Sequence, residues 1–485
     1  MSADTSSWDV VVIGGGPPGE NVAHAAVAGS DRTAVIVEAE LVGGECSYWA
    51  CMPSKALLRP IEAADAVRAL PGAAVGPIDV AAVLARRDSF TSHHDDRSQV
   101  EWCHGVGVDV VRGRGRLAGE REVLVTDATG AERSITARLA VVLATGTTAT
   151  VPPVDGLAEA LPWTSRDVTN CAEIPRRVVV LGGGVVACEA ATWLRGLGAA
   201  EVVIVERGGS LLGRLEPFAG VLVAQRFDEL GIRVLNGREV RSVRRVAPAA
   251  TGYGRLHGGE VTVVLDDGQR IEADEVVVAA GRTPASAGLG LGTAGVDVSG
   301  TNGFVVVDDH LTVPGTDWLY AVGDLTGRAL LTHMGKYQAR VAGAVIAARA
   351  EGRPLDDRCS DLADRDAVPA VVFTDPEVAS VGRSEAEARA GGVDVEVLEY
   401  DLAAVAGAAL VRDGYRGHAK LVVDRTSDTL VGATFVGAGV AELLHSATVA
   451  LVGRVPLSTL WHAVPSYPTI SEVWLRLLES RTATG

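Results

Sequence analysis

Lysine is nearly absent from this sequence: only three of its 44 basic residues are lysine, and the rest are arginine. The three are Lys55, Lys336 and Lys420. Acidic residues outnumber basic ones, and the net charge of −17 argues against nucleic acid as a partner, since phosphates require clustered Lys and Arg. Because lysine is so rare in this arginine-rich chain, each lysine is a candidate functional residue, Lys55 above all.

Long apolar runs are also missing. No stretch of about 18 or more uncharged apolar residues occurs, so we expect no membrane span. Residues 1–8 are polar and acidic, without the basic stretch and apolar core of a secretory signal. These absences predict a cytoplasmic protein that neither crosses nor binds a membrane. Its 485 residues exceed one ordinary core, so about two to four domains are expected.

Cysteine is too scarce for a disulfide scaffold, with six in the whole chain. Four of them are isolated and are interpreted as structural thiols: Cys103, Cys171, Cys188 and Cys359. Cys46 and Cys51 differ, because they lie close together behind a Gly-Gly pair. In a reducing cytosol a close pair is usually catalytic, redox-sensing or metal-binding. Zinc would need two further ligands, and none is adjacent, so no metal site is expected.

A dinucleotide-binding pattern occupies residues 9–38. A β-branched run at residues 9–13 is followed by Gly-Gly-Gly-Pro-Pro-Gly, an Ala-rich helical segment at residues 20–28 and a second strand at residues 33–37, which leads to Glu38. In this G-x-G-x-x-G motif, Gly14 permits the tight turn, Gly16 lets the pyrophosphate approach, and Gly19 lets helix and strand pack closely. The helix N-terminus would face the phosphates and Glu38 the ribose.

The same pattern returns at residues 177–206, with Gly182, Gly184, Ala187 and Glu206 in the corresponding places. Glu206 favours NADH, since a carboxylate repels a 2′-phosphate, while the neighbouring Arg207 leaves NADPH possible. Two dinucleotide units and one close cysteine pair predict an electron relay.

With these motifs the whole chain resembles the class I pyridine nucleotide–disulfide oxidoreductases, which include dihydrolipoamide dehydrogenase, glutathione, mycothione and mercuric reductases. Four further segments are similar to elements of that family. Thr145 and Gly146 belong to one FAD element and Asp324 to another, whereas Gly281 and Arg282 belong to the segment that closes the NAD domain. Residues 373–382 look like the opening of the interface domain.

The resemblance implies an α/β fold with two Rossmann-like dinucleotide-binding domains and a C-terminal α+β dimerisation domain. The FAD domain would be split between residues 1–150 and 285–358. The NAD(P) domain would occupy residues 151–284, and the interface domain residues 359–485. Family members are homodimers that bind FAD and a nicotinamide dinucleotide, so FAD, NADH and a second copy of the chain are expected.

The cysteine pair would lie on the first turn of a helix, whose N-terminus stabilises a thiolate. By the resemblance, Cys51 takes electrons from the flavin and Cys46 attacks the substrate. Lys55 would place a positive charge beside the flavin, with Glu189 as its counter-charge. The predicted cofactor-binding set is Gly14, Gly16, Gly19, Glu38, Gly44, Lys55, Thr145, Gly146, Asp324, Gly182, Gly184, Ala187, Glu206, Gly281 and Arg282.

Three departures from the family pattern concern the substrate side. Glu45 replaces the threonine that commonly bonds the cofactor. Tyr48 and Trp49 stand between the cysteines, where the family has small or polar residues, and they either pack internally or narrow access. Tyr467 stands where disulfide reductases carry an acid–base histidine, five residues before Glu472, the expected partner of that histidine.

A phenol with a pKa of about 10 is a poor base at neutral pH, whereas histidine near ~6.5 is well matched. His462, upstream, is an alternative base. Mercuric reductases also have tyrosine here, but they carry a terminal cysteine pair that this chain lacks. We therefore predict NAD(P)H-dependent reduction of Cys46–Cys51 through FAD, with an unidentified small-molecule acceptor. The alternatives are an ordinary dihydrolipoamide dehydrogenase or low-molecular-weight disulfide reductase, a quinone or diaphorase-type flavin reductase, and a redox-sensing interaction protein.

Overall fold

The computed structural model describes residues 6–482 and forms two compact units. Unit 1 contains Met1–Met52, Asp88–Thr148 and Arg282–Arg365, and unit 2 contains Pro53–Arg87, Ala149–Gly281 and Asp366–Gly485. The predicted α/β fold class is confirmed, with a mixed sheet in unit 1, a parallel sheet in unit 2 and a C-terminal α+β portion. The four-segment domain division remains a prediction. Residues 1–5 of the N-terminus and the last three residues of the cysteine-free C-terminus lie outside the described part.

Unit 1 is built on a seven-stranded sheet with the order β3-β2-β1-β6-β5-β4, and β16 pairs with β6. The strands β1, β2, β3, β6 and β16 run parallel within this sheet, and β5 and β4 extend it with antiparallel pairing beyond β6. Their bounds are β1 Ser7–Ile13, β2 Ala34–Glu38, β3 Val108–Arg112, β4 Arg114–Gly119, β5 Glu122–Thr126, β6 Glu132–Leu143 and β16 Leu319–Ala321. The buried apolar runs of β1 and β2 are typical of strands covered on both faces.

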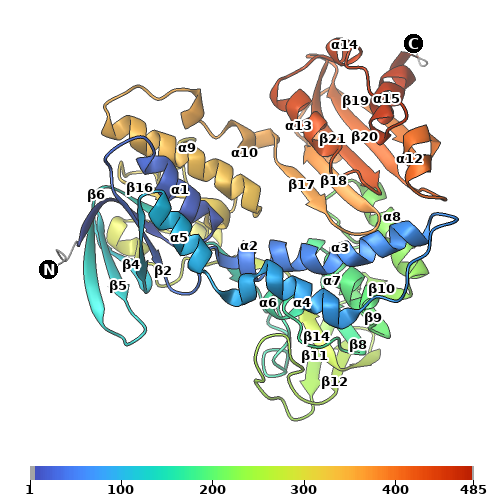
Figure 1. Cartoon of the computed structure of the whole chain (residues 1–485), viewed down its shortest axis with the longest axis horizontal. Coiled ribbons are helices and arrows are strands. Elements are labelled where there is room, and N and C mark those ends of the chain that lie inside the picture. Colours follow the sequence, from blue (N-terminus) through green and yellow to red (C-terminus); the bar gives the residue numbers. More distant parts are fainter. Residues whose placement is uncertain (1–5, 483–485) are drawn as a thin grey trace. The chain divides into compact units, whose positions relative to one another are not determined.

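Two helices of unit 1, α1 (Pro17–Val27) and α9 (Thr332–Ala350), pack side by side (Figure 1). Their contact is close because it uses small residues: a Cβ added at Gly343 would come within 2.4 Å of the Ala25 Cβ. The other elements of this unit are α2 (Gly44–Tyr48), α5 (Arg97–Gly105) and the small pair β7 (Thr147–Ala149) with β15 (Arg282–Pro284).

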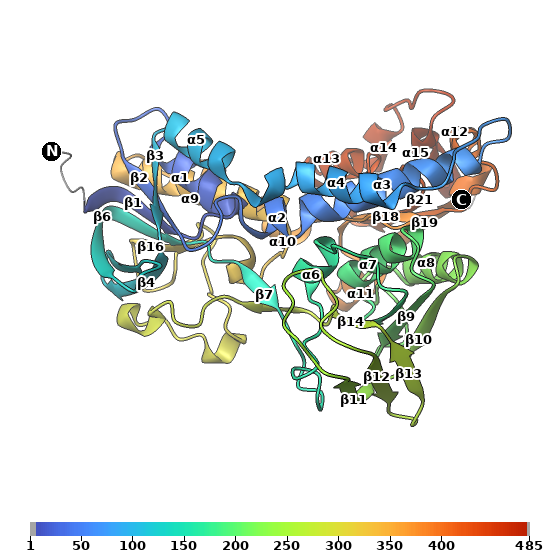
Figure 2. The same ribbon diagram turned by 60° about the horizontal axis from the view of Figure 1, so that its bottom comes forward.

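Unit 2 contains a four-stranded parallel sheet with the order β10-β9-β8-β14. Alternate side chains of β8 and β9 point to opposite faces: Val178 and Val180 pack with helices, while Val179 and Leu181 pack with a three-stranded sheet. Figure 2 shows these layers. The bounds are β8 Arg177–Leu181, β9 Glu201–Glu206, β10 Ile232–Asn236, β11 Val240–Arg245, β12 Val261–Leu265, β13 Arg270–Ala273, β14 Glu275–Val278, α6 Ser165–Thr169, α7 Val185–Gly196 and α8 Pro217–Glu229.

The helix α3 (Cys51–Arg68) begins at the second cysteine, and its later turns belong to unit 2. Leu57, Leu58 and Ile61 join the helix-side core of the parallel sheet, together with Val83 of α4 (Val80–Phe90). The Cβ position of Gly196 on α7 lies 2.7 Å from the Ile61 side chain. The sequence segment after the cysteines thus packs against the second dinucleotide fold.

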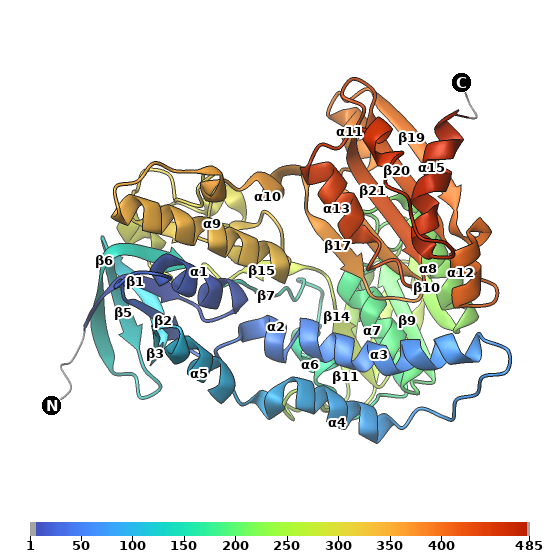
Figure 3. The same ribbon diagram turned by 45° about the horizontal axis from the view of Figure 1, so that its top comes forward.

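The C-terminal part of unit 2 is a five-stranded antiparallel sheet with the order β17-β18-β21-β20-β19, and α13 and α15 lie against it (Figure 3). Its elements are β17 Pro369–Val372, β18 Glu377–Gly382, α11 Glu385–Ala390, β19 Val395–Asp401, α12 Ala406–Val411, β20 His418–Asp424, β21 Thr429–Gly437, α13 Leu444–Val452, α14 Leu457–Leu460 and α15 Val473–Thr482. The short helix α10 (Leu362–Asp366) comes just before them, at the end of the last segment of unit 1. Lys420 of β20 is buried and pairs with Glu216 at 2.9 Å and Glu385 at 2.6 Å. No helix within residues 6–482 has the length and apolar character needed to cross a bilayer.

Candidate active site

The first glycine-rich turn connects β1 to α1 in unit 1. Gly14 has φ 106°, and a Cβ there would lie 2.4 Å from the Ala144 carbonyl oxygen, so no other residue fits. The Gly15 amide donates to Glu38 Oε2 at 2.6 Å, which fixes the turn to the end of β2. Gly16 is the N-cap of α1, and its Cβ position has no neighbour closer than 3.9 Å. This exposed helix N-terminus is suited to a phosphate.

The second glycine-rich turn, in unit 2, repeats this geometry. Glu206, at the end of β9, accepts from the Gly183 and Gly208 amides, both at 2.5 Å. The Cβ position of Gly184 at the α7 N-cap faces open space, and Ala187 is fully buried in the helix–sheet contact. Both turns therefore combine an open helix N-terminus with a carboxylate fixed by a backbone amide.

The first cysteine lies in α2, which rests on the first glycine-rich turn. The Gly43 amide donates to the Gly15 carbonyl at 2.7 Å. A Cβ on Gly44 would lie 2.7 Å from the Gly16 Cα, so the two glycine pairs must approach each other without side chains. The sequence predicts one helix bearing both cysteines, but the structure has Cys46 in the short α2 and Cys51 as the first residue of α3.

The two thiols face each other and a hydroxyl at the start of α9. Cys51 Sγ lies 3.4 Å from Thr332 Oγ1, and Thr332 also hydrogen-bonds Cys46. The adjacent Cys51 thiol and burial raise the pKa of Cys46, whereas Thr332 and Lys336 act in the opposite direction. Both cysteines are partly exposed, while the other four cysteines are buried. Only this pair can meet a substrate and exchange electrons internally.

Tyr48 and Trp49 are packing residues and do not narrow access to the thiols. Their exposed fractions are 1% and 7%, and their rings contact each other and His94. The Tyr48 hydroxyl donates to the Val42 carbonyl at 3.0 Å. Of the two interpretations open from the sequence, the structure therefore supports internal packing.

Glu45, which replaces the usual threonine, belongs to a polar network around Asp324. Arg282 Nη2 lies 3.7 Å from Glu45 Oε2, and Arg282 donates to the Thr147 hydroxyl at 2.5 Å. The Thr147 hydroxyl donates in turn to Asp324 Oδ2 at 2.9 Å. Burial raises the pKa of Asp324. Arg282 thus lies beside Asp324, the carboxylate of the second predicted FAD element. The neighbouring FAD element is fixed by Thr145, which donates to the Ala285 carbonyl at 2.9 Å, while Gly146 accepts from the Ala285 amide.

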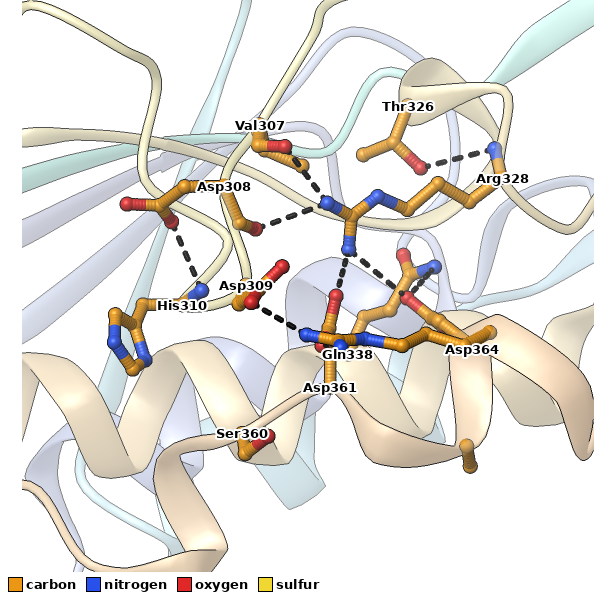
Figure 4. Close-up of polar contacts among 12 residues, drawn as sticks. Val307, Asp308, Asp309, His310, Thr326, Arg328, Gln338, Ser360, Asp361 and Asp364 are labelled. Carbon is orange, nitrogen blue, oxygen red and sulfur yellow. Dashed lines mark hydrogen bonds and ion pairs between the residues drawn. The ribbon is translucent and has the colours of Figure 1, made fainter.

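The turn that carries Asp324 is supported from α9 by a buried glutamine. Gln338 is fully buried; its Oε1 accepts from the Gly323 amide at 2.7 Å and its Nε2 donates to Asp364 at 2.9 Å. Figure 4 shows how Arg328 contacts Asp361 and Asp364 together with the carbonyls of Val307 and Asp308. These contacts fix the position of Asp324 through its neighbour Gly323.

Within unit 2, Lys55 and Glu189 form an ion pair of 2.7 Å. Glu189 is buried, and its other oxygen accepts from the Phe373 amide at 3.0 Å. The Lys55 ammonium also lies 4.8 Å from the centre of the Phe373 ring. Helix α3 places Lys55 one turn after Cys51.

Tyr467 and Glu472 are not brought together. Tyr467 is 76% exposed, whereas Glu472 is buried and pairs with Arg476 at 2.5 Å. Between residues 6 and 482 no hydrogen bond joins Tyr467 to Glu472, and Glu472 Oε2 has no hydrogen-bond partner there. His462 is exposed in the turn after α14. Neither predicted base is paired with a carboxylate within residues 6–482.

Comparison with known proteins identifies the family. The model of the pyridine nucleotide-disulphide oxidoreductases matches residues 8–352, and the model of their dimerisation domain matches residues 368–477. This chain is a pyridine nucleotide–disulfide oxidoreductase. It is 31% identical to a dihydrolipoyl dehydrogenase of Chlamydia muridarum over 480 residues, covering 96% of this chain and 95% of the relative. A mercuric reductase of Staphylococcus aureus is 29% identical over 469 residues, covering 96% and 81%.

Among solved structures, the HOCl-induced flavoprotein disulfide reductase RclA from Escherichia coli has the same fold. The TM-score is 0.81 at 24% identity, and the match covers 97% of this chain and 99% of RclA. Family membership makes this oxidoreductase an FAD-dependent NAD(P)H disulfide oxidoreductase. The chain also carries the family's dimerisation domain.

The residues of unit 1 fit FAD. The open N-cap at Gly16 suits the pyrophosphate, and the buried Asp324 carboxyl suits a hydroxyl-bearing chain. A Cβ at Gly323 would lie 2.9 Å from Pro18, so the Asp324 turn and the first glycine-rich turn are adjacent. The sequence predicted no role for three residues of this region, Thr332, Gln338 and Glu20. Only Lys336 carried a signal, its rarity as a lysine.

Proposed function

We propose that this oxidoreductase is an NADH-preferring homodimer that uses Cys46–Cys51 to reduce an acceptor other than an ordinary disulfide. The observation that carries the proposal is the cysteine pair itself. It lies on the glycine-rich turn that fits FAD, with Thr332 in contact with both thiols. When bound, FAD supplies two-electron transfer from the nicotinamide to a disulfide.

The balanced half-reaction is NADH plus the Cys46–Cys51 disulfide plus one proton, giving NAD⁺ and two thiols. Cys46 is then the group that attacks the acceptor, and Cys51, beside Thr332, is the thiol that closes the disulfide again. Lys55, held by Glu189 and Phe373, supplies a fixed positive charge one helical turn after Cys51. A positive charge at this position stabilises negative charge on the reduced cysteine pair.

The preference for NADH is supported by Glu206. Its carboxylate is fixed by two backbone amides at the second glycine-rich turn, where a 2′-phosphate would meet negative charge. The proposal that the acceptor is not an ordinary disulfide is supported by Tyr467, which is exposed and lacks a carboxylate partner within residues 6–482. Without a base of suitable pKa, protonation of a leaving thiol is slow at neutral pH. An acceptor that needs no such proton, such as a soft metal ion or a quinone, suits this site.

The test is an anaerobic reductive titration of the FAD-loaded enzyme. Wild type should consume two NADH per FAD, one for the disulfide and one for the flavin, with a thiolate–flavin charge-transfer absorbance midway. Cys46→Ser should consume one, and Cys103→Ser, at a buried isolated thiol, should consume two. Half-saturation should need about tenfold less NADH than NADPH, or 1.4 kcal/mol. One equivalent in wild type, with no effect of Cys46→Ser, would overturn the relay.

A further inference from the structure

Helix α9 presents two polar side chains toward the cysteine pair. Thr332 and Lys336 are four residues apart, so both lie on one face of this helix. Thr332 contacts both thiols, and the Lys336 ammonium is close enough to Cys46 to favour its thiolate form. The positive end of the helix points the same way. The cysteine pair therefore has a cation on its α9 side, in addition to Lys55 on α3.

A carboxylate faces Lys336 from the neighbouring helix. Glu20 lies in the first turn of α1, and α1 packs tightly on α9, with the Cβ position of Gly335 only 2.7 Å from Pro18. Glu20 and Lys336 attract each other, since Lys336 opposes the rise in the pKa of Glu20 that burial causes. The pKa of Glu20 is raised to about 7, in the range where the enzyme would operate.

We propose that Lys336 is the positioning residue that holds the Cys46 thiolate, and that ionisation of Glu20 on α1 weakens this hold. The inference rests on the proposed function, in which Cys46 must be a thiolate to attack its acceptor. The adjacent Cys51 thiol disfavours ionisation of Cys46, and burial adds to that effect. The Lys336 cation on α9 counters both effects on the ionisation of Cys46, whereas the exposed Tyr467 side chain supplies no cation.

The direction of the pH effect follows from the groups around the two residues. Cys46 faces Cys51 from α3 and Thr332 and Lys336 from α9. Glu20 faces Lys336 and, from β2, Glu38, whose charge disfavours ionisation of Glu20. Below pH about 7 Glu20 is neutral and the Lys336 charge acts on Cys46 unopposed. Above that pH the Glu20 carboxylate offsets Lys336.

Two more titrating groups sense Glu20, namely Tyr48 of α2 and Cys103 of α5. The pKa of each is raised, first by burial and then by nearby acidic charge that includes Glu20. Both groups are therefore neutral near pH 7 and leave the Lys336–Glu20 balance unchanged.

The experiment measures iodoacetamide alkylation of the FAD-loaded enzyme against pH, after reduction by one equivalent of NADH. Alkylation forms a thioether and releases iodide, and peptide mass spectrometry identifies Cys46. Lys336→Gln should raise the apparent pKa of Cys46 by about one unit, a roughly tenfold slower reaction at neutral pH. Glu20→Gln should lower it, because the opposing carboxylate is removed. Lys336→Arg should restore the wild-type profile.

The matched control is Arg340→Gln, which removes an exposed cation one turn further along α9 and should leave the profile unchanged. Equal profiles for wild type and Lys336→Gln, or shifts of the same sign in Lys336→Gln and Glu20→Gln, would overturn the inference. The proposed function fails separately: wild type would then gain no alkylatable thiols on adding NADH. A general weakening of the fold would not produce opposite shifts at the two positions.

Discussion

Glu38 and Glu206 each hold a glycine-rich turn in place by accepting from a backbone amide, in addition to the ribose contact that the sequence predicts for them. Lys55 and Glu189, paired on the basis of family resemblance, lie 2.7 Å apart. Thr332 and Lys336 reach the cysteines across about 280 residues of sequence, and such a contact depends on tertiary packing alone.

At the residue scale, the missing base gives a prediction. Tyr467→His should raise lipoamide turnover at neutral pH by about tenfold, about 1.4 kcal/mol of barrier, because imidazole can exchange protons there and a phenol cannot. Steady-state assays with NADH and lipoamide measure the change. Tyr467→Phe is the control and should gain nothing. If Tyr467→His is no faster than wild type, the low proton-transfer capacity of Tyr467 does not limit disulfide turnover.

The strand–turn–helix–strand elements were predictable because local chemistry dictates them. The expected strands at residues 9–13 and 33–37 correspond to β1 and β2, and the expected helix at residues 20–28 to α1, which begins three residues earlier at Pro17. The break between α2 and α3 was not foreseen. Tyr48 and Trp49 turn into the core there, which separates Cys46 from the helix that Cys51 starts. Packing of these two aromatic side chains in the core accompanies the end of α2 at Tyr48, before Cys51.

At the element scale, the α9 helix supports the Asp324 turn through one side chain. Gln338→Leu leaves the buried Gly323 amide without its acceptor, at a cost of about 1–3 kcal/mol. We expect at least tenfold weaker FAD binding, because Asp324 follows Gly323 directly. Fluorescence titration of the apoprotein with FAD measures this. Gln338→Glu keeps an acceptor for the amide and should bind FAD more tightly than Gln338→Leu; equal affinities would contradict the role of that hydrogen bond.

On the scale of the whole molecule, the dimerisation domain has an apolar surface that this chain leaves uncovered. Helix α13 buries Leu444, Ala447 and Ala450 on one face, and on the other it exposes Val449 and Val452. These exposed apolar side chains lie within residues 368–477, which match the family's dimerisation domain, so they are suited to contact with a second copy of the chain. Family membership predicts such a contact, but the sequence pattern could not mark its residues, because an outward-facing valine is common on monomeric surfaces.

The corresponding prediction concerns the oligomeric state. Wild type should sediment as a dimer, and Val449→Asp should shift the equilibrium toward monomer by at least tenfold in dissociation constant, because a buried carboxylate without a partner is costly. Val246→Asp, at a valine of similar exposure outside the dimerisation domain, is the control and should remain dimeric. A Val449→Asp protein as dimeric as the control would place the interface elsewhere.

The three lysines have a consequence for chemical modification. Lys55 and Lys420 are ion-paired with carboxylates, and Lys336 faces Glu20. Acetylation neutralises an amine but leaves a guanidinium charged, so it would spare nearly all the positive charge on this protein. Its side-chain targets would be these three positions. Limited acetylation would therefore selectively remove the positive charges of these charge pairs. Its effect at Lys336 would be measured as a change in the reactivity of the cysteine pair.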